Sequence, residues 1–248
     1  MTQPVPEPLD HRTFMDRTLR ASRFIGCDFR EVVIRGSEIA GMELDSPWLF
    51  EGDGTLVVNG VDVAPFVDGE LNRRFPGRAS RTAGDPAGLR DAWAAVERTW
   101  AATVAHALAM PEGTLDASVA GEWSLAQTLR HLVMATDTWL GRAILGHPQP
   151  YHPIGLPNDG GDSAAYDPSV FSDAAPTFDD VLAARAERTA MVREFIAGVT
   201  DDELAAHRPN PHAPEHDETV LSCLRTILEE EWEHHRYAVR DLDALAAG

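Results

Sequence analysis

The spacing of apolar side chains changes once along this chain of 248 residues, and that change limits the fold more than any other feature. In residues 20–44 a large apolar residue occupies every fifth position, a period that fits neither an α-helix nor a flat strand. From about residue 89 the apolar residues follow a helical period instead. We therefore expect a small β part followed by a mainly α part with a sizeable core. The fifth-position residues are Phe24, Phe29, Ile34, Ile39 and Leu44.

The period-five segment, about residues 15–45, resembles a pentapeptide repeat, whose four-sided β-coil turns a corner every five residues. Five or six units make little more than one coil, which cannot bury enough surface alone. We therefore expect the segment to pack against another part of the chain. Two ordinary strands with an accidental period stay the alternative. In the coil Cys27 would be a small inward-facing residue rather than a nucleophile. Asn59-Gly60, between two apolar runs, predicts a hairpin turn.

The chain is expected to divide into a short β region, residues 1–80, and a four-helix bundle, residues 81–248, with a Gly-, Pro- and Arg-rich boundary at 74–88. The helical pattern predicts helices at about 87–110, 124–146, 178–199 and 218–246. Ser124 and Asp201 carry cap-type side chains, and Gly146 follows a last helical turn. The connection of some thirty residues between the second and third helices is long enough to suggest a functional loop.

The last predicted helix carries the strongest chemical signal. Glu231 lies within its apolar stripe, and His235, four residues later, lies on the same face. A lone buried carboxylate is costly, so it must be paired, protonated or bound to a metal. An Arg from another helix is the structural alternative. Glu and His four residues apart suit a divalent metal such as zinc, whereas His234 is expected at the edge of the stripe, outside the ligand set.

A third ligand is available in the second predicted helix, where His131 lies off the aliphatic stripe, among small and polar residues. From its position alone it is either a surface histidine or a residue that lines a groove. The sequences Gly121-Glu122-Trp123-Ser124 and Leu129-Arg130-His131-Leu132 resemble the second-helix signature of the DinB-like four-helix bundles. Residues 231–235 (EWEHH), residues 240–242 (RDL) and the loop 150–157 (PYHPIGLP) resemble other segments of that family.

The resemblance covers residues of about 85–246 and implies one divalent metal, held by His131, Glu231 and His235. Zinc is expected, with nickel or another first-row metal as alternatives. Glu followed by His in the last helix is similar to the branch with mycothiol-dependent maleylpyruvate isomerase and related thiol S-transferases. The implied activity is transfer of a low-molecular-weight thiol, mycothiol, to an electrophilic small molecule. Candidates for holding or covering the substrates are Tyr151, His152, Arg142, Arg236 and Arg240.

Composition narrows the function classes. All 21 basic residues are Arg, which excludes mechanisms that need a lysine amine and suggests a GC-rich genome such as that of an actinobacterium, where mycothiol occurs. The net charge of −19 argues against nucleic acid and anionic membranes as partners. Only two cysteines and no apolar leader favour the cytoplasm. A homodimer stays open. Cys223 is expected to be a small buried residue.

Two other function classes remain. The same metal could activate water, which would make the protein a hydrolase of a small molecule. A non-catalytic metal-binding or interaction protein is the second. The repeat is too short, and its corners too rich in Arg, for it to imitate DNA.

Overall fold

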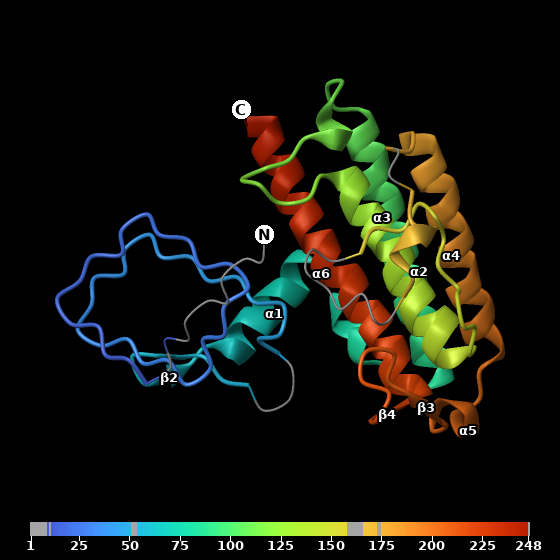
Figure 1. Cartoon of the computed structure of the whole chain (residues 1–248), viewed down its shortest axis with the longest axis horizontal. Helices are drawn as coiled ribbons and strands as arrows, with labels where there is room; N and C mark the ends of the chain where they lie inside the picture. Colours follow the sequence, from blue (N-terminus) through green and yellow to red (C-terminus); the bar gives the residue numbers. More distant parts are fainter. Residues whose placement is uncertain (1–8, 10, 51–53, 158–165, 173–174, 248) are drawn as a thin grey trace. The chain divides into compact units, whose positions relative to one another are not determined.

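A computed structural model describes residues 9, 11–50, 54–157, 166–172 and 175–247 of the chain (Figure 1). The chain forms two compact units, Met1–Asp45 and Ser46–Gly248, which are described separately. Residues 46–80, which were expected to belong to the β region, are thus part of the same unit as the helices.

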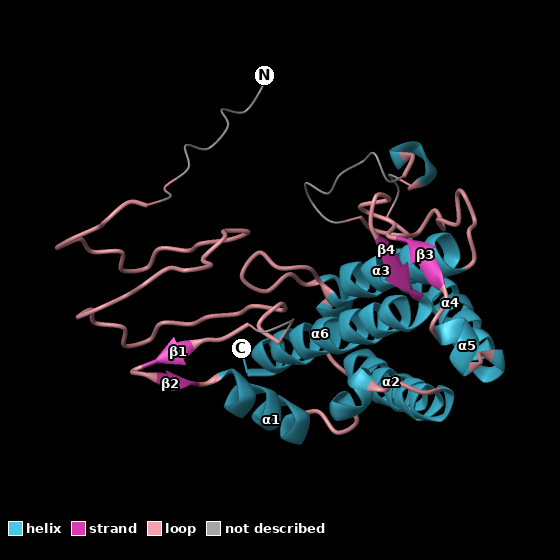
Figure 2. Ribbon diagram, turned by 90° about the horizontal axis from the view of Figure 1, so that it is seen from below, coloured by secondary structure: helices cyan, strands magenta, loops and turns pink. Residues whose placement is uncertain are grey.

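The first unit follows the predicted period of five. Every fifth residue from His11 to Gly41 has a positive φ, and a turn is closed by a backbone hydrogen bond at every tenth residue, as between Ser22 N and Leu19 O at 3.1 Å. Its described residues form turns and loops without β-strands (Figure 2). The fifth-position side chains from Phe24 to Leu44 are 49–61% exposed, and Cys27 is exposed too, contrary to the inward position expected for it.

The second unit begins with the predicted hairpin. Strands β1 (Val57–Val58) and β2 (Val61–Asp62) pair antiparallel, and Asn59 and Gly60 both have positive φ, as a two-residue turn of this twist requires. Helix α1 (Ala64–Arg74) follows and was not expected. Gly69 and Asn72 are weak helix formers, which obscures its helical pattern in the sequence.

The predicted boundary at 74–88 is a packed segment rather than a linker. It contains the 3₁₀ turn η1 (Arg78–Thr82), in which Arg78 and Arg81 are buried. Both guanidinium groups bind Asp68 of α1, at 2.6 and 2.8 Å. Arg78 also lies 3.6 Å from Glu233 of the last helix. These ion pairs join α1 and η1 to the bundle.

The four predicted helices are confirmed. They are α2 (Pro86–Leu108), α3 (Leu125–Thr136) with its π-helical continuation η3 (Asp137–Ile144), α4 (Phe178–Gly198) and α6 (Val220–Ala247). Both α2 and α3 pack against α4 and α6, which gives a mainly helical bundle (Figure 1). Short elements connect them: η2 (Thr114–Asp116), η5 (Pro168–Val170), α5 (Asp201–Leu204) and the antiparallel strands β3 (His207–Pro209) and β4 (Asp217–Thr219).

The helix ends are set by the local sequence. Ser124 caps α3 in a capping box with Gln127, because each side chain hydrogen bonds the backbone N–H of the other residue. Gly146 has a positive φ after η3, as expected. Asp201 is the first residue of α5, and the capping side chain is that of Thr200.

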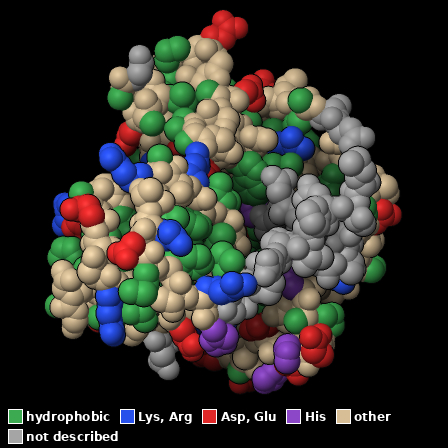
Figure 3. Space-filling view, turned by 60° about the vertical axis from the view of Figure 1, so that its left-hand side comes forward, with side chains coloured by type: hydrophobic (Ala, Val, Ile, Leu, Met, Phe, Trp, Pro, Cys, Tyr) green, Lys and Arg blue, Asp and Glu red, His purple; other side chains and the backbone are tan. Residues whose placement is uncertain are grey.

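The core of the bundle lies between its four helices. Its largest side chains with less than 2% exposure include Trp93, Leu129, Ile196 and Leu228. Outside it, hydrophobic side chains reach the surface among charged ones (Figure 3). Within the described residues, no helix combines the length and the apolar character that crossing a membrane requires.

Gly77 joins α1 to η1 where only glycine fits. Its φ is +103°, and an added Cβ would lie 2.9 Å from the Ala95 Cβ and 3.3 Å from the Trp232 ring. Gly113 has a similar φ of +90°, but no atom lies within 4 Å of the added Cβ. The two positions therefore separate backbone strain from steric overlap.

We expect Gly113→Ala to cost about 1 kcal/mol, because a left-handed conformation strains any residue with a Cβ. Gly77→Ala should cost at least about 1 kcal/mol more, since the overlap with buried atoms adds to the same strain. Urea unfolding of both variants measures the difference. Equal losses of stability would show that the contact with Trp232 is easily relieved.

Candidate metal site

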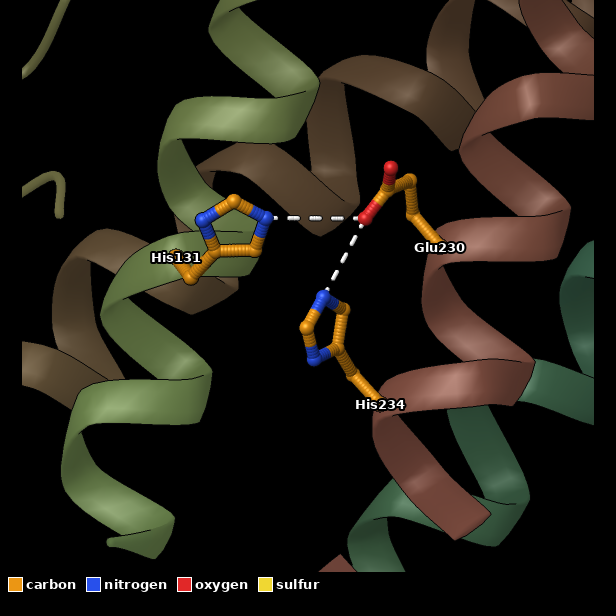
Figure 4. A group of neighbouring side chains, drawn as sticks. All are labelled: His131, Glu230 and His234. Carbon is orange, nitrogen blue, oxygen red and sulfur yellow. Dashed lines mark ion pairs between the residues drawn. The ribbon is translucent and has the colours of Figure 1, made fainter. Parts of the chain in front are cut away.

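Three side chains from two helices meet beside the core. His131 comes from α3, and Glu230 and His234 come from α6 (Figure 4). A carboxylate oxygen of Glu230, Oε2, lies 3.5 Å from His131 Nε2 and 3.2 Å from His234 Nε2. The three candidate ligand atoms all lie within 4.8 Å of one another. Two imidazole nitrogens and one carboxylate oxygen therefore point at a common volume.

The helices place these residues simply. Glu230 and His234 are four residues apart, so their side chains lie on one face of α6, one turn apart. His131 projects from the facing helix, since α3 packs directly against α6. His131 is buried, whereas the side chains of Glu230 and His234 keep 33% and 17% exposure. The site thus lies at the border between core and solvent.

The orientation of His131 is fixed from behind. Its Nδ1 lies 3.0 Å from the carbonyl oxygen of Leu156, in the long connection after η3. A carbonyl only accepts hydrogen bonds, so Nδ1 carries the proton and donates it. Nε2, the nitrogen that faces Glu230, is then the one left for a metal to bind in place of a proton. Metal-binding histidines in proteins generally have such a partner on their second nitrogen.

The electrostatics of the site favour the forms that bind metals. Burial opposes ionisation of Glu230, but its hydrogen bonds with His131 and His234 outweigh burial and lower the pKa of this carboxyl below its usual range. Burial also lowers the pKa of His234, against the opposing hydrogen bond with Glu230. An ionised carboxylate and a neutral imidazole are the forms that coordinate metals.

Aromatic rings line the site. The Trp123 ring lies 4.9 Å from the His131 ring and stacks on the His234 ring at 6.0 Å, measured between centroids. The two imidazoles are 4.7 Å apart, and Tyr237 contacts His234 edge-on. In the sequence Trp123 was noticed only as part of a family signature. Helical periodicity cannot show that a residue just before α3 contacts a side chain of α6.

The residues fit a divalent metal such as zinc. Two His and one Glu form a ligand set that zinc enzymes use, with the fourth position left for water or substrate. Bonds of about 2.1 Å in a tetrahedral arrangement separate ligand atoms by about 3.4 Å. The two spacings to Glu230 Oε2, 3.5 and 3.2 Å, agree with that value. Glu230 is therefore already at a coordinating distance from both imidazoles, and the three ligand atoms lie within 4.8 Å of one another.

Two of the three predicted ligands lie elsewhere. Glu231 is buried in the apolar stripe of α6, as expected, but both its oxygens bind the guanidinium group of Arg185 from α4. His235 is also buried, with its Nε2 at 2.8 Å from Thr103 Oγ1 of α2. Burial lowers the pKa of His235 to about 4. The structure thus brings His131 together with Glu230 and His234, not with Glu231 and His235.

The physical reason is the direction of each helix face. Residues 229–235 (EEEWEHH) contain two pairs of Glu and His at a spacing of four, one residue out of register. The pair on the apolar stripe faces a dry core, where Arg185 neutralises the carboxylate. The pair before it lies about 100° around the helix, beside the polar sector of α3 that contains His131. A metal site open to solvent belongs at that border, which could have been inferred from the sequence.

The predicted loop residues Tyr151 and His152 lie in the connection that follows η3. Tyr151 is buried against the rings of Tyr166 and Phe171, at 5.7 and 6.0 Å. His152 is half-buried, and its backbone N–H donates to Asp137 at 2.8 Å. Residues 158–165 of the same connection lie outside the described part of the chain.

The predicted arginines differ in their surroundings. Arg236 binds Glu233 at 2.8 Å, and Arg240 binds Asp241 at 2.7 Å. Both guanidinium groups lie over the Tyr237 ring. Arg142 is half-buried in η3.

Cys223 is fully buried, and burial raises the pKa of its thiol to about 11. It is therefore the small inert residue that was predicted.

A comparison with protein families places the bundle. The sequence model described as the DinB superfamily matches residues 95–238, which is more than half of the chain and includes all three residues of the site. Comparisons with curated proteins and with solved structures gave no significant match.

Exchanging the neighbouring glutamates should separate metal binding from stability. Glu230→Gln is expected to lose stoichiometric zinc with little effect on unfolding, because its side chain is partly exposed and its partners are two imidazoles rather than a buried guanidinium group. Glu231→Gln should keep zinc but destabilise the fold by roughly 3–5 kcal/mol, because it leaves the Arg185 charge buried without a partner. Metal analysis and urea unfolding of both variants measure these effects.

The same comparison applies to the histidines. His234→Ala should lose zinc and His235→Ala should keep it. The reverse pattern in both pairs would return the ligands to Glu231 and His235.

Zinc affinity should fall at acid pH, because protons compete with the metal for imidazole nitrogens. The lowered pKa of His234 keeps this ligand neutral below the ordinary imidazole value of about 6.5. We therefore expect nearly constant affinity at pH 7–8 and a decline below about pH 6. Titration against a chromophoric chelator measures it. An affinity that is unchanged at pH 5 would argue against imidazole ligands.

Proposed function

Because the chain belongs to the DinB superfamily, we propose that it is a metal-dependent transferase that joins a low-molecular-weight thiol, mycothiol, to an electrophilic small molecule. The observation that carries the proposal is the set of two imidazoles and one carboxylate, His131, Glu230 and His234, at the edge of the core. Three protein ligands leave room for a substrate atom.

A bound divalent cation supplies a Lewis acid that favours the deprotonated form of a coordinating thiol at neutral pH. The reaction then breaks the S–H bond of the thiol and the π bond of the electrophile, and it forms a C–S bond to the electrophilic carbon. In an addition to a carbon–carbon double bond, the thiol proton passes through solvent to the neighbouring carbon. No oxidant or reductant is needed.

The residues of the chain prepare this chemistry. The Leu156 carbonyl accepts a hydrogen bond from His131 Nδ1, so that Nε2 is the nitrogen that would coordinate. Glu230 stays ionised and offsets part of the charge of the cation. Trp123 lies flat against His234 and covers that side of the site with an apolar ring. Partial burial limits access of water that would compete with the thiol.

The choice of a thiol rests on the ligand set. Glu followed by His four residues later in the last helix is similar to the thiol-dependent branch of the family, and the pair Glu230 and His234 keeps that order and spacing. The absence of Lys suits a mycothiol-producing host. We place the polar groups of the thiol near Arg236 and Arg240, whose guanidinium groups lie over Tyr237, next to His234. Tyr151, His152 and Arg142 are kept as further substrate contacts.

Hydrolysis is the second candidate, because zinc hydrolases also use two His and one Glu. The two reactions differ in whether a thiol binds at the metal and is consumed.

The direct test is calorimetric titration of the zinc-loaded protein with mycothiol, followed by thiol-consumption assays with a panel of electrophiles. We expect a binding signal that disappears in Glu230→Gln, which should lose the metal, and persists in the control Glu97→Gln, which removes a partly exposed carboxylate paired with Arg193. No binding of mycothiol or other cellular thiols, together with zinc-dependent cleavage of esters or amides, would make the protein a hydrolase.

A further inference from the structure

The connection after η3 is fastened to the helix that carries His131. His152 N–H donates to Asp137 at 2.8 Å, and the Ile154 carbonyl accepts from Arg130 Nε at 2.8 Å. Leu156 N–H donates to the Arg130 carbonyl at 3.2 Å. The last contact in this series is the Leu156 carbonyl, which accepts from His131 Nδ1 at 3.0 Å.

Two glycines allow the connection to lie this close. A Cβ added to Gly141, in η3, would lie 2.6 Å from the Pro150 Cβ, closer than real Cβ atoms approach. A Cβ added to Gly155 would lie 3.1 Å from the His152 carbonyl oxygen and 3.4 Å from the Met134 Cβ. The connection therefore lies closest to the helix at Pro150 and touches it again at Gly155.

The π-helical segment η3 anchors this arrangement. Asp137, its first residue, is fully buried and is held by Arg188 of α4 at 2.6 Å. Asp137 thereby connects Arg188 of α4 to the backbone of His152. π-helical turns are rare and occur often near functional sites, where they change the direction of the side chains that follow. Here the segment contains both Asp137 and Gly141, the residues that hold the connection.

We infer that segment 150–156 is a positioning element of the metal site, which fixes the tautomer and the direction of the His131 imidazole through the Leu156 carbonyl. Gly141 is its main positioning residue, because a side chain there would displace Pro150 and the backbone behind it. The inference rests on the proposed metal site. The inference assigns a role to a segment that contributes no metal ligand and that lies 19 residues or more after His131 in the sequence.

The test compares Gly141→Ala with Gly198→Ala, a matched helical control in α4 where an added Cβ meets no atom within 4 Å. Loss of a partner that orients a metal-binding histidine weakens metal affinity by about 10–100-fold. We expect a loss of that size for Gly141→Ala and none for Gly198→Ala, measured by zinc competition with a chelator. Thermal unfolding of both variants shows whether the fold is retained.

Imidazole ¹⁵N NMR adds a readout that a purely structural role would not change. The metal-free wild-type protein should show His131 protonated on Nδ1, and Gly141→Ala should show a mixture of both tautomers. If Gly141→Ala does not fold, Arg130→Met takes its place in both measurements. This substitution removes the hydrogen bond to the Ile154 carbonyl and keeps the apolar part of the side chain.

The outcomes distinguish the metal site from the positioning role of segment 150–156. A wild-type protein that binds no zinc would overturn the metal site itself. Zinc binding in which Gly141→Ala or Arg130→Met equals the wild type would overturn the positioning role alone. A wild-type His131 without a proton on Nδ1 would overturn it without any variant.

Discussion

A carboxylate buried in an apolar core needs a counter-charge, and Glu231 finds one in Arg185 of α4. Burial raises the pKa of Glu231, and the guanidinium group opposes that shift, so the two charges depend on each other. Removing one partner of such a pair costs far more than the pair contributes by itself. The pair therefore fixes which side of α6 faces the bundle interior. With Glu231 facing inward, the preceding residue must lie about 100° around the helix, and there Glu230 meets His131 of α3.

The same interior explains the neighbouring histidines. His235 follows Glu231 by one turn and lies between the rings of Trp100 and Phe75, where a charge would be costly and the imidazole stays neutral. His234 is in register with Glu230 and keeps partial contact with solvent. Two pairs with the same residue types and the same spacing thus take different roles. One pair completes the packing of the core, and the other offers ligands to an ion that must enter from solvent.

Much of this could be predicted from the sequence. Helical periodicity gave all four long helices within a few residues, and the period of five is visible in the positive φ at every fifth residue from His11 to Gly41. Helix α1 was missed because Gly69 and Asn72 weaken its pattern. His131 was found through its motif. Its partners were assigned one residue too late, because periodicity shows which face is apolar and does not show that an Arg from another helix neutralises a carboxylate there. The pairing of Glu231 with an Arg, kept as an alternative, is what the structure contains.

The contacts behind His131 could not be predicted in the same way, because they depend on backbone groups. The Leu156 carbonyl and the His152 N–H carry no signal in the residue type that supplies them. What the sequence does record is the space they need, in the form of Gly141, where a side chain would collide with Pro150 of the connection, and of Gly155, where a side chain would crowd Phe171 and the His152 carbonyl. A glycine in a helix costs up to about 1 kcal/mol of stability relative to alanine. The place of Gly141 in η3 is explained by the close approach of Pro150, which a side chain at that position would prevent. The stability that Gly141 costs η3 thus serves the orientation of the His131 imidazole in the preceding helix, α3.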